Sequence, residues 1–167
     1  MPSFLSRFIG SSRSNPHVPA DPVSRDAQST DEYITIEFLE RATGAMHQGT
    51  VGYRVGPDTL VSFAVWDGPS SRSAGFDLFE AFMTARQGLE AQGFIPLIAG
   101  AARHCYPSGM ARNMGEGDQV YRLTPGKAPE IEDLVFMFDP VEAESVATLA
   151  EQKKAFEHWA DRMAQET

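Results

Sequence analysis

The feature that most constrains this chain is an alternation of apolar and polar residues in three successive segments. In the first segment, Ile34, Ile36 and Phe38 fall on one face of an extended chain. A period of two is the pattern of a strand with one buried face. The segments with this pattern are 33–38, 50–55 and 60–66. The chain is therefore expected to form a sheet and to cover one side of it.

The sequences that follow these strands predict a turn, a loop and a helix. Residues 56–59 read Gly-Pro-Asp-Thr, and because proline fixes φ while glycine and aspartate accept turn geometries, they predict a β-hairpin. The small-residue stretch 70–75 is expected to be a loop. Apolar residues then recur at helical spacing from Phe76 to Leu89, and Gly93 follows where a left-handed C-cap is expected.

The second half of the chain predicts three more strands and one more helix. Residues 94–102 are apolar on both faces, and the strand is expected to begin after Pro96, which lacks a backbone donor. Segments 119–123 and 134–138 are the other two expected strands. A helix is predicted from residue 140 to about residue 163, with Asp139 as N-cap, Pro140 in the first position and Glu142 completing a capping box.

This order of strands and helices predicts an α+β fold, with an antiparallel or mixed sheet of about five to six strands and two main helices packed on one face. Residues 1–31 are rich in serine and proline and are expected to form a flexible N-terminal tail, followed by a single domain over 32–167. The expected core combines the apolar positions of these elements: Ile34, Ile36, Phe38, Val61, Phe63, Phe79, Phe82, Ile98, Phe136, Leu149, Phe156 and Trp159.

Charge and cysteine content narrow the classes of function. The net charge is −9, which argues against a nucleic-acid partner bound through clustered lysines and arginines. Acidic residues outnumber basic ones ten to three in 130–166, so the last helix is expected to present an acidic face. There is one cysteine, no run of 18 apolar residues, and Arg7 interrupts the apolar N-terminal residues. We expect a cytoplasmic protein with no membrane contact.

Catalytic motifs are missing from the sequence. It contains no P-loop, no dinucleotide-binding glycine pattern, no zinc-protease motif and no nucleophile elbow. His104 and Cys105 are sequence neighbours, and on an extended chain neighbours point to opposite faces, which argues against a catalytic pair. We therefore predict no catalytic residue, no metal site and no cofactor, and we expect a non-enzymatic function.

One polar cluster could instead bind a ligand. Arg103, His104, Tyr106 and Arg112 follow the apolar stretch 94–102. Arginine side chains match the geometry of carboxylate and phosphate groups, so a small enzyme or ligand-binding domain that recognises an anionic small molecule is the alternative function. The competing interpretation is that these arginines pair with acidic residues of the same chain.

A resemblance favours a binding function. The sequence Tyr-Pro-Ser-Gly-Met-Ala-Arg-Asn-Met-Gly-Glu-Gly at 106–117, with Val-Tyr-Arg-Leu at 120–123, resembles a segment of small uncharacterised bacterial proteins of toxin and immunity loci. This resemblance implies an immunity protein that neutralises a bacterial toxin by direct binding. A partner with a basic surface is expected to meet the acidic residues and the two tryptophans: Glu142, Glu144, Glu151, Glu157, Trp66 and Trp159. The oligomeric state is left open.

Overall fold

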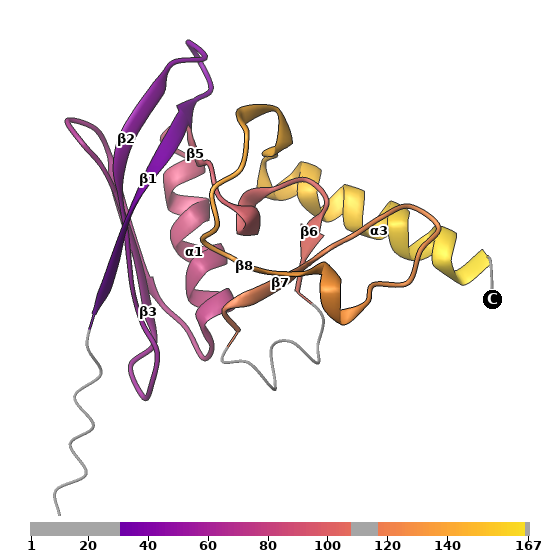
Figure 1. Cartoon of the computed structure of the whole chain (residues 1–167). Helices are drawn as coiled ribbons and strands as arrows, with labels where there is room; N and C mark the ends of the chain where they lie inside the picture. The colour runs from indigo at the N-terminus through magenta and orange to yellow at the C-terminus, as the bar shows by residue number, and fades with distance from the viewer. Residues whose placement is uncertain (1–30, 108–116, 166–167) are drawn as a thin grey trace, which may run out of the picture.

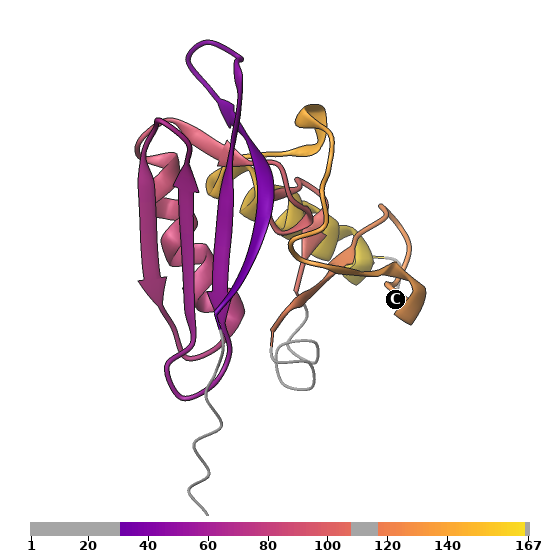
Figure 2. The same cartoon turned by 60° about the vertical axis from the view of Figure 1, so that its left-hand side comes forward.

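The computed structural model describes residues 31–107 and 117–165, and these form an α+β fold, as the sequence predicted (Figure 1). The described strands belong to two antiparallel sheets rather than one. The larger sheet has the strand order β4-β3-β2-β1-β5 and the smaller has the order β6-β7-β8. In Figure 2 the larger sheet lies on one side of the molecule, with helix α1 against it and the smaller sheet beyond.

The larger sheet grows from the three alternating segments. Its strands are β1 (Glu32–Glu40), β2 (Met46–Arg54), β3 (Leu60–Val65), β4 (Ser70–Ala74) and β5 (Phe94–Pro96). The predicted hairpin is confirmed by the pairing of Val51 with Phe63 and of Tyr53 with Val61 across β2 and β3. Phe38, Val51 and Phe63 are fully or almost fully buried on the same face of the sheet.

Strand β4 corrects one expectation, because residues 70–74 were predicted to be a loop. They pair with β3 along its length, with Ser71 opposite Phe63. Edge pairing depends on backbone hydrogen bonds, so a polar sequence without an apolar stripe can still form a strand. The small side chains also allow a close approach of helix α1. A Cβ atom added to Gly88 would lie 2.4 Å from Ser71 Oγ.

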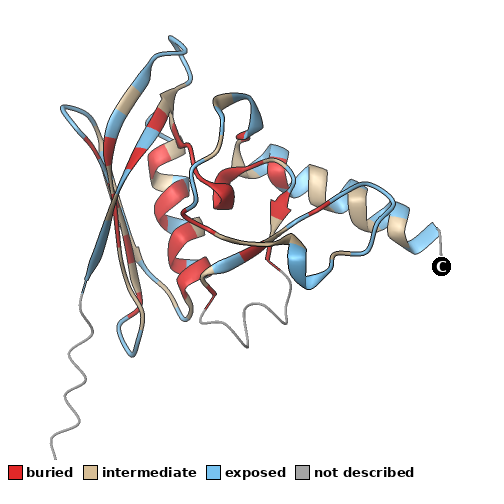
Figure 3. Cartoon of the chain, viewed as in Figure 1, coloured by how far each residue is buried: buried red, intermediate tan, exposed pale blue. Residues whose placement is uncertain are grey.

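Helix α1 (Leu78–Glu90) covers the inner face of the larger sheet (Figure 3). It begins two residues later than the apolar spacing indicated, because Asp77 caps it by accepting a hydrogen bond from Glu80 N at 2.7 Å. Phe76 therefore lies outside the helix and is 94% exposed. Gly93 has φ +88°, but it belongs to the turn before β5, and the C-cap is Ala91.

The apolar stretch 94–102 also differs from the prediction. Strand β5 ends at Pro96 instead of beginning after it, and Ala99–Ala101 form the 3₁₀ turn η1. Pro96 is accommodated because β5 is the outer strand of its sheet, where one side of the backbone needs no partner. The chain then enters the smaller sheet, made of β6 (Cys105–Tyr106), β7 (Gln119–Arg122) and β8 (Leu134–Phe136), with the 3₁₀ turn η2 (Ile131–Asp133) before β8.

The last helix begins nine residues later than predicted. Helix α3 spans Leu149–Gln165, and residues 140–148 are mostly extended, with the 3₁₀ turn η3 (Ala143–Ser145). The capping box is formed by Thr148 and Glu151: Thr148 N donates to Glu151 Oε2 at 2.8 Å, and Glu151 N donates to Thr148 Oγ1 at 3.2 Å. Pairing of Pro140 with Ile98 holds the earlier segment extended, so Asp139 caps no helix.

The predicted core is largely buried. Seven of the twelve expected residues are buried: Ile36, Phe38, Val61, Phe63, Phe79, Phe82 and Ile98. The other five are only partly buried: Ile34, Phe136, Leu149, Phe156 and Trp159. Three of these five belong to α3, which contacts β6 through the stacking of Phe156 on Tyr106 and buries only Gln152 among its described residues. The first 30 residues of the predicted tail lie outside the described part of the chain.

Candidate functional site

Residues 140–145 form an arch over the segment that follows β5. Both ends of the arch are bonded to that segment: Val141 N donates to Leu97 O at 3.1 Å, and Arg103 N donates to Ser145 O at 2.8 Å. Between these contacts the chain bends away through turn η3. The arch is the looped segment between β8 and α3 in Figure 1. It carries the exposed side chains of Glu142 and Glu144.

A cleft of about 730 Å³ lies on one side of the arch. Its polar lining comes from two directions, with Arg103, His104 and Arg122 from the segment around β6 and β7, and Glu142 and Glu144 from the arch. Ala99, Ala102, Leu123 and Val141 contribute apolar surface. The volume falls within the range of small-molecule sites, which is roughly 300–1,000 Å³.

A groove of about 540 Å³ lies on the other side of the arch. It runs between the arch and the β1–β2 hairpin, and Leu39, Met46 and Leu97 supply much of its apolar lining. Its charged residues are all acidic: Glu37, Glu142 and Glu144. Within residues 31–107 and 117–165, none of these three carboxylates has an ion-pair partner within 4.0 Å.

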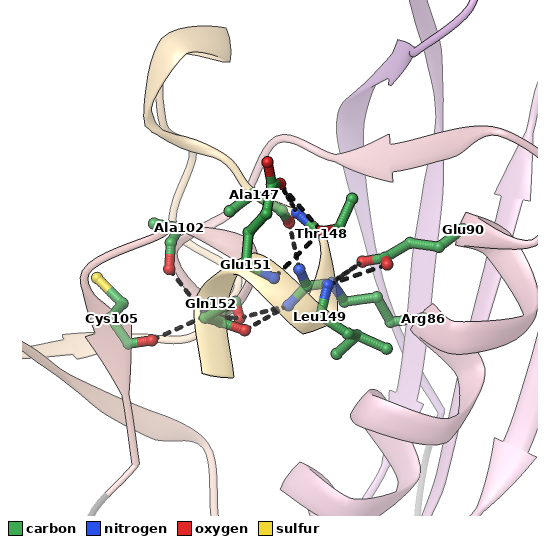
Figure 4. Close-up of polar contacts among 10 residues, drawn as sticks. Arg86, Glu90, Ala102, Cys105, Ala147, Thr148, Leu149, Glu151 and Gln152 are labelled. Carbon is green, nitrogen blue, oxygen red and sulfur yellow. Dashed lines mark hydrogen bonds and ion pairs between the residues drawn. The ribbon is translucent and has the colours of Figure 1, made fainter. Parts of the chain in front are cut away.

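A buried polar network holds the segment beneath the arch (Figure 4). The amide nitrogen of Gln152 lies 2.8 to 2.9 Å from three carbonyl oxygens, those of Gly100, Ala102 and Cys105, which share its two N–H donors. Its amide oxygen accepts from Arg86 Nη1 at 2.7 Å. Because one side chain from α3 satisfies three carbonyls of the segment 100–105, it fixes the backbone that presents Arg103 and His104 to the cleft.

Arg86 is the charged centre of this network and has no solvent exposure. Its guanidinium donates to Glu90 Oε1 at 2.7 Å, to Gly100 O at 3.2 Å and to Ala147 O. Burial lowers the pKa of Arg86, and the neighbouring Glu90 carboxylate opposes that effect. Glu90 also accepts from Leu149 N, the first residue of α3. The network therefore joins α1, η1 and α3, and its role is positional.

The structure separates the predicted ligand-binding residues. Arg103 and His104 line the cleft, and Arg103 Nη2 lies 3.8 Å from Glu151 Oε1, so it also has the contact with an acidic residue that the competing interpretation expected. Tyr106 lies away from the cleft, stacked on Phe156 with ring centroids 4.1 Å apart. Arg112 lies outside the described residues. Arg122 was missed, although its position opposite Cys105 brings it beside the cleft.

The four predicted partner-binding glutamates do not share one helix face. Glu142 and Glu144 lie on the arch, because α3 begins only at Leu149. Glu151 is engaged in the helix cap, and hydrogen bonds from Thr148 lower the pKa of its carboxyl. Glu157 lies six residues further along α3 and pairs with Lys153 at 3.8 Å. Glu37 was missed, since only the sheet brings it beside the arch.

The two tryptophans occupy different places. Trp66 follows β3, is 52% exposed and lines neither the cleft nor the groove. Trp159 is partly buried on α3, where its indole nitrogen donates to Thr124 O at 3.0 Å. Trp159 lines a small hollow together with Arg103 and His104, next to the cleft. Of the two, Trp159 is therefore the one near the candidate site.

The cleft also contains the single thiol. Cys105 is 5% exposed, and burial raises its pKa, so it is held in the neutral form. No nucleophilic role follows, because the thiolate is the reactive form. Across the described residues, no group of three His, Cys, Asp or Glu side chains is arranged to hold a metal ion. Within the described ranges, no helix has the length and apolarity to cross a membrane.

Comparison with known proteins assigns no family. No protein-family model matches the chain, and no curated protein matches it. The resemblance of residues 106–123 to proteins of toxin and immunity loci therefore stays a prediction.

Proposed function

We propose that this chain is a protein-binding domain and that the groove receives a basic, partly apolar segment of its partner. The observation that carries the proposal is the combination of an apolar floor with three carboxylates that lack ion-pair partners in the described part of the chain. Met46 is 46% exposed at this groove, so apolar surface is available to a partner. Anchoring by apolar contacts within a charged rim is typical of protein interfaces.

Electrostatics favour a basic partner at this place. Glu37, Glu142 and Glu144 come from two separate elements and converge on one groove, and the whole chain carries a net charge of −9. Complementary charge accelerates encounter and disfavours partners of like charge. In this proposal Glu142 and Glu144 steer association, whereas Glu151 stabilises α3 and Glu157 contributes only to the general charge.

The resemblance around residues 106–123 supports a bacterial toxin as the partner, with this chain as its immunity protein acting in the cytoplasm. The missing catalytic motifs support inhibition by binding rather than by chemistry. The single, buried cysteine is compatible with a reducing compartment, because no disulfide within the chain is possible.

The test expresses the products of the genes adjacent to the one that encodes this chain and uses one that is toxic when expressed alone. Association is measured by stopped-flow fluorescence at several salt concentrations, and protection is measured by co-expression. Replacing Glu37, Glu142 and Glu144 with glutamine should slow association about tenfold at low salt and flatten its salt dependence. The matched control replaces Glu132 and Glu157 with glutamine and Asp161 with asparagine, which removes the same charge at other exposed positions.

Equal effects of the two triple variants would show that net charge, and not the groove, governs binding. Binding that neither triple variant changes would place the docking surface elsewhere. Failure to bind the adjacent gene product, with no protection on co-expression, would overturn the immunity function.

A further inference from the structure

We propose that the cleft on the opposite side of the arch is a separate binding site for a short zwitterionic ligand of the amino-acid or dipeptide class. The groove and the cleft share the arch, but Arg103, His104 and Arg122 line the cleft and not the groove. The ligand's carboxylate would meet these basic residues, and its ammonium group would meet Glu142 and Glu144.

The cleft carries basic and acidic side chains that form no ion pairs with one another. In the described ranges, no ion pair within 4.0 Å joins Arg103 or Arg122 to Glu142 or Glu144. The volume of about 730 Å³ between the walls is large enough for a small organic molecule. A molecule with one charge of each sign can therefore satisfy both walls at once.

The same charges disfavour other ligand classes. A polyanion would be attracted to Arg103 and Arg122 but repelled by the two arch glutamates. A polycation would be attracted to the glutamates but repelled by the arginines. Arginine pairs with a carboxylate through two parallel hydrogen bonds, which a free α-carboxylate can accept. Ala99, Ala102 and Leu123 offer apolar surface for a side chain.

The basic wall is presented by fixed backbone. Leu123 N donates to His104 O at 2.7 Å, and Gln152 holds the carbonyls of Ala102 and Cys105, so the backbone on both sides of Arg103 is restrained. The contact of Arg103 with Glu151 at 3.8 Å joins two side chains that are 41% and 49% exposed. Exposed pairs of this kind are weak, so Arg103 can turn towards a ligand.

The experiment is isothermal titration of the full chain with alanyl-alanine, alanyl-leucine and alanyl-lysine. Each dipeptide is compared with its N-acetylated form, which lacks the ammonium group, and with its C-amidated form, which lacks the carboxylate. At least one free dipeptide should bind, and each blocked form should bind about tenfold more weakly, the factor that corresponds to about 1.4 kcal/mol.

Variants locate the site. Arg122→Gln and Glu144→Gln should each weaken binding of the free dipeptide about fivefold or more, a loss expected for a charge-assisted hydrogen bond. Arg72→Gln on β4 and Glu157→Gln on α3 remove the same charges at exposed positions outside the cleft and should leave binding unchanged. Glu37→Gln should also leave it unchanged, because Glu37 lines only the groove, so this test is independent of partner binding.

Three results would overturn the proposal: no binding by any dipeptide at millimolar concentration, equal binding of free and blocked forms, or binding that Arg122→Gln leaves intact. Titration with inorganic phosphate distinguishes the proposed zwitterion site from a simple anion site. Phosphate binding that requires Arg122 and is unaffected or strengthened by Glu144→Gln, together with no dipeptide binding, would replace the zwitterion with an anion.

Discussion

The two helices of this protein are stabilised by different means. Helix α1 packs on the larger sheet and buries seven residues, six of them apolar. The described part of α3 buries one residue, Gln152, and that residue is polar. Phe82 of α1 contacts Phe63, Phe79 and Phe138, whereas Gln152 contacts three backbone carbonyls and Arg86.

This difference indicates that apolar burial supplies stability at α1, whereas the polar network around Gln152 positions a segment of the backbone. Apolar burial is strong but has little directional preference, which suits the larger sheet and α1, since their register is already set by strand pairing. A hydrogen-bonded network requires particular geometry and is costly when incomplete. It therefore suits the segment beneath the arch, where the backbone hydrogen bonds belong to turns and isolated bridges rather than to a continuous strand ladder.

The largest effect is expected in the apolar region. Phe82→Ala should lower the free energy of unfolding by about 3–5 kcal/mol, because it leaves a cavity between α1 and the larger sheet. Urea denaturation monitored by tryptophan fluorescence measures the loss. Phe76→Ala is the control and should change stability by less than about 0.5 kcal/mol, since Phe76 is 94% exposed.

Removal of the buried charge tests the polar region. Arg86→Met should cost about 3 kcal/mol, because it leaves the Glu90 carboxylate without its partner. The double variant Arg86→Met, Glu90→Gln should recover part of that loss by removing the isolated charge. Hydrogen exchange should show increased exchange first at Gly100, Ala101 and Leu149, and uniform acceleration that includes β2 and β3 would contradict the division between the regions.

Substitutions at the two positions where the last helix could begin are expected to change stability less. Thr148→Ala should lower stability by about 1 kcal/mol, because Thr148 caps α3 in the structure. Asp139→Ala should change it by less than about 0.5 kcal/mol, although the sequence pattern placed the cap there. Thermal and urea unfolding of the two variants decide between these positions. A larger loss of stability in Asp139→Ala than in Thr148→Ala would support the longer helix that the sequence predicted from residue 140.

The smallest effect concerns pH. Hydrogen bonds from Thr148 lower the pKa of Glu151 in the folded protein below its ordinary value of 4.5. The carboxylate therefore stabilises the fold above about pH 4.5, and the contribution is lost as the pH falls through the lowered folded pKa. Glu151→Gln should reduce the slope of stability between about pH 5 and pH 3. An unchanged slope would contradict the cap.

Sequence patterns predicted the larger sheet well, because alternation depends on which face of each strand is buried. Ile36, Phe38 and Phe63 were assigned correctly for that reason. The same patterns missed β4, whose pairing depends on backbone groups, and misplaced the start of α3. The sequence Asp-Pro-Val-Glu at 139–142 has every local feature of a capping box, but pairing of Pro140 with Ile98 holds it extended. Local preference is worth about 1 kcal/mol, and tertiary pairing exceeded it.

The candidate site was predicted in part. Arg103 and His104 were found because they follow an apolar segment, and Glu142 and Glu144 because they are acidic. That these four residues lie around one arch, with Arg122 and Glu37 beside them, depends on contacts between segments far apart in the chain. Tyr106 shows the opposite outcome, since its position next to the arginines gave no sign that its ring stacks on Phe156.

The sequence by itself determined the α+β class, the buried face of each long strand, the first helix and the acidic balance of the chain, because these depend on periodicity and composition. The tertiary structure alone decided that the strands divide into two sheets, that Arg86 and Gln152 are buried together, and that basic and acidic residues line a common cleft. The physical reason is that burial of a polar side chain depends on partners supplied by distant segments, and no local pattern in the sequence specifies those partners.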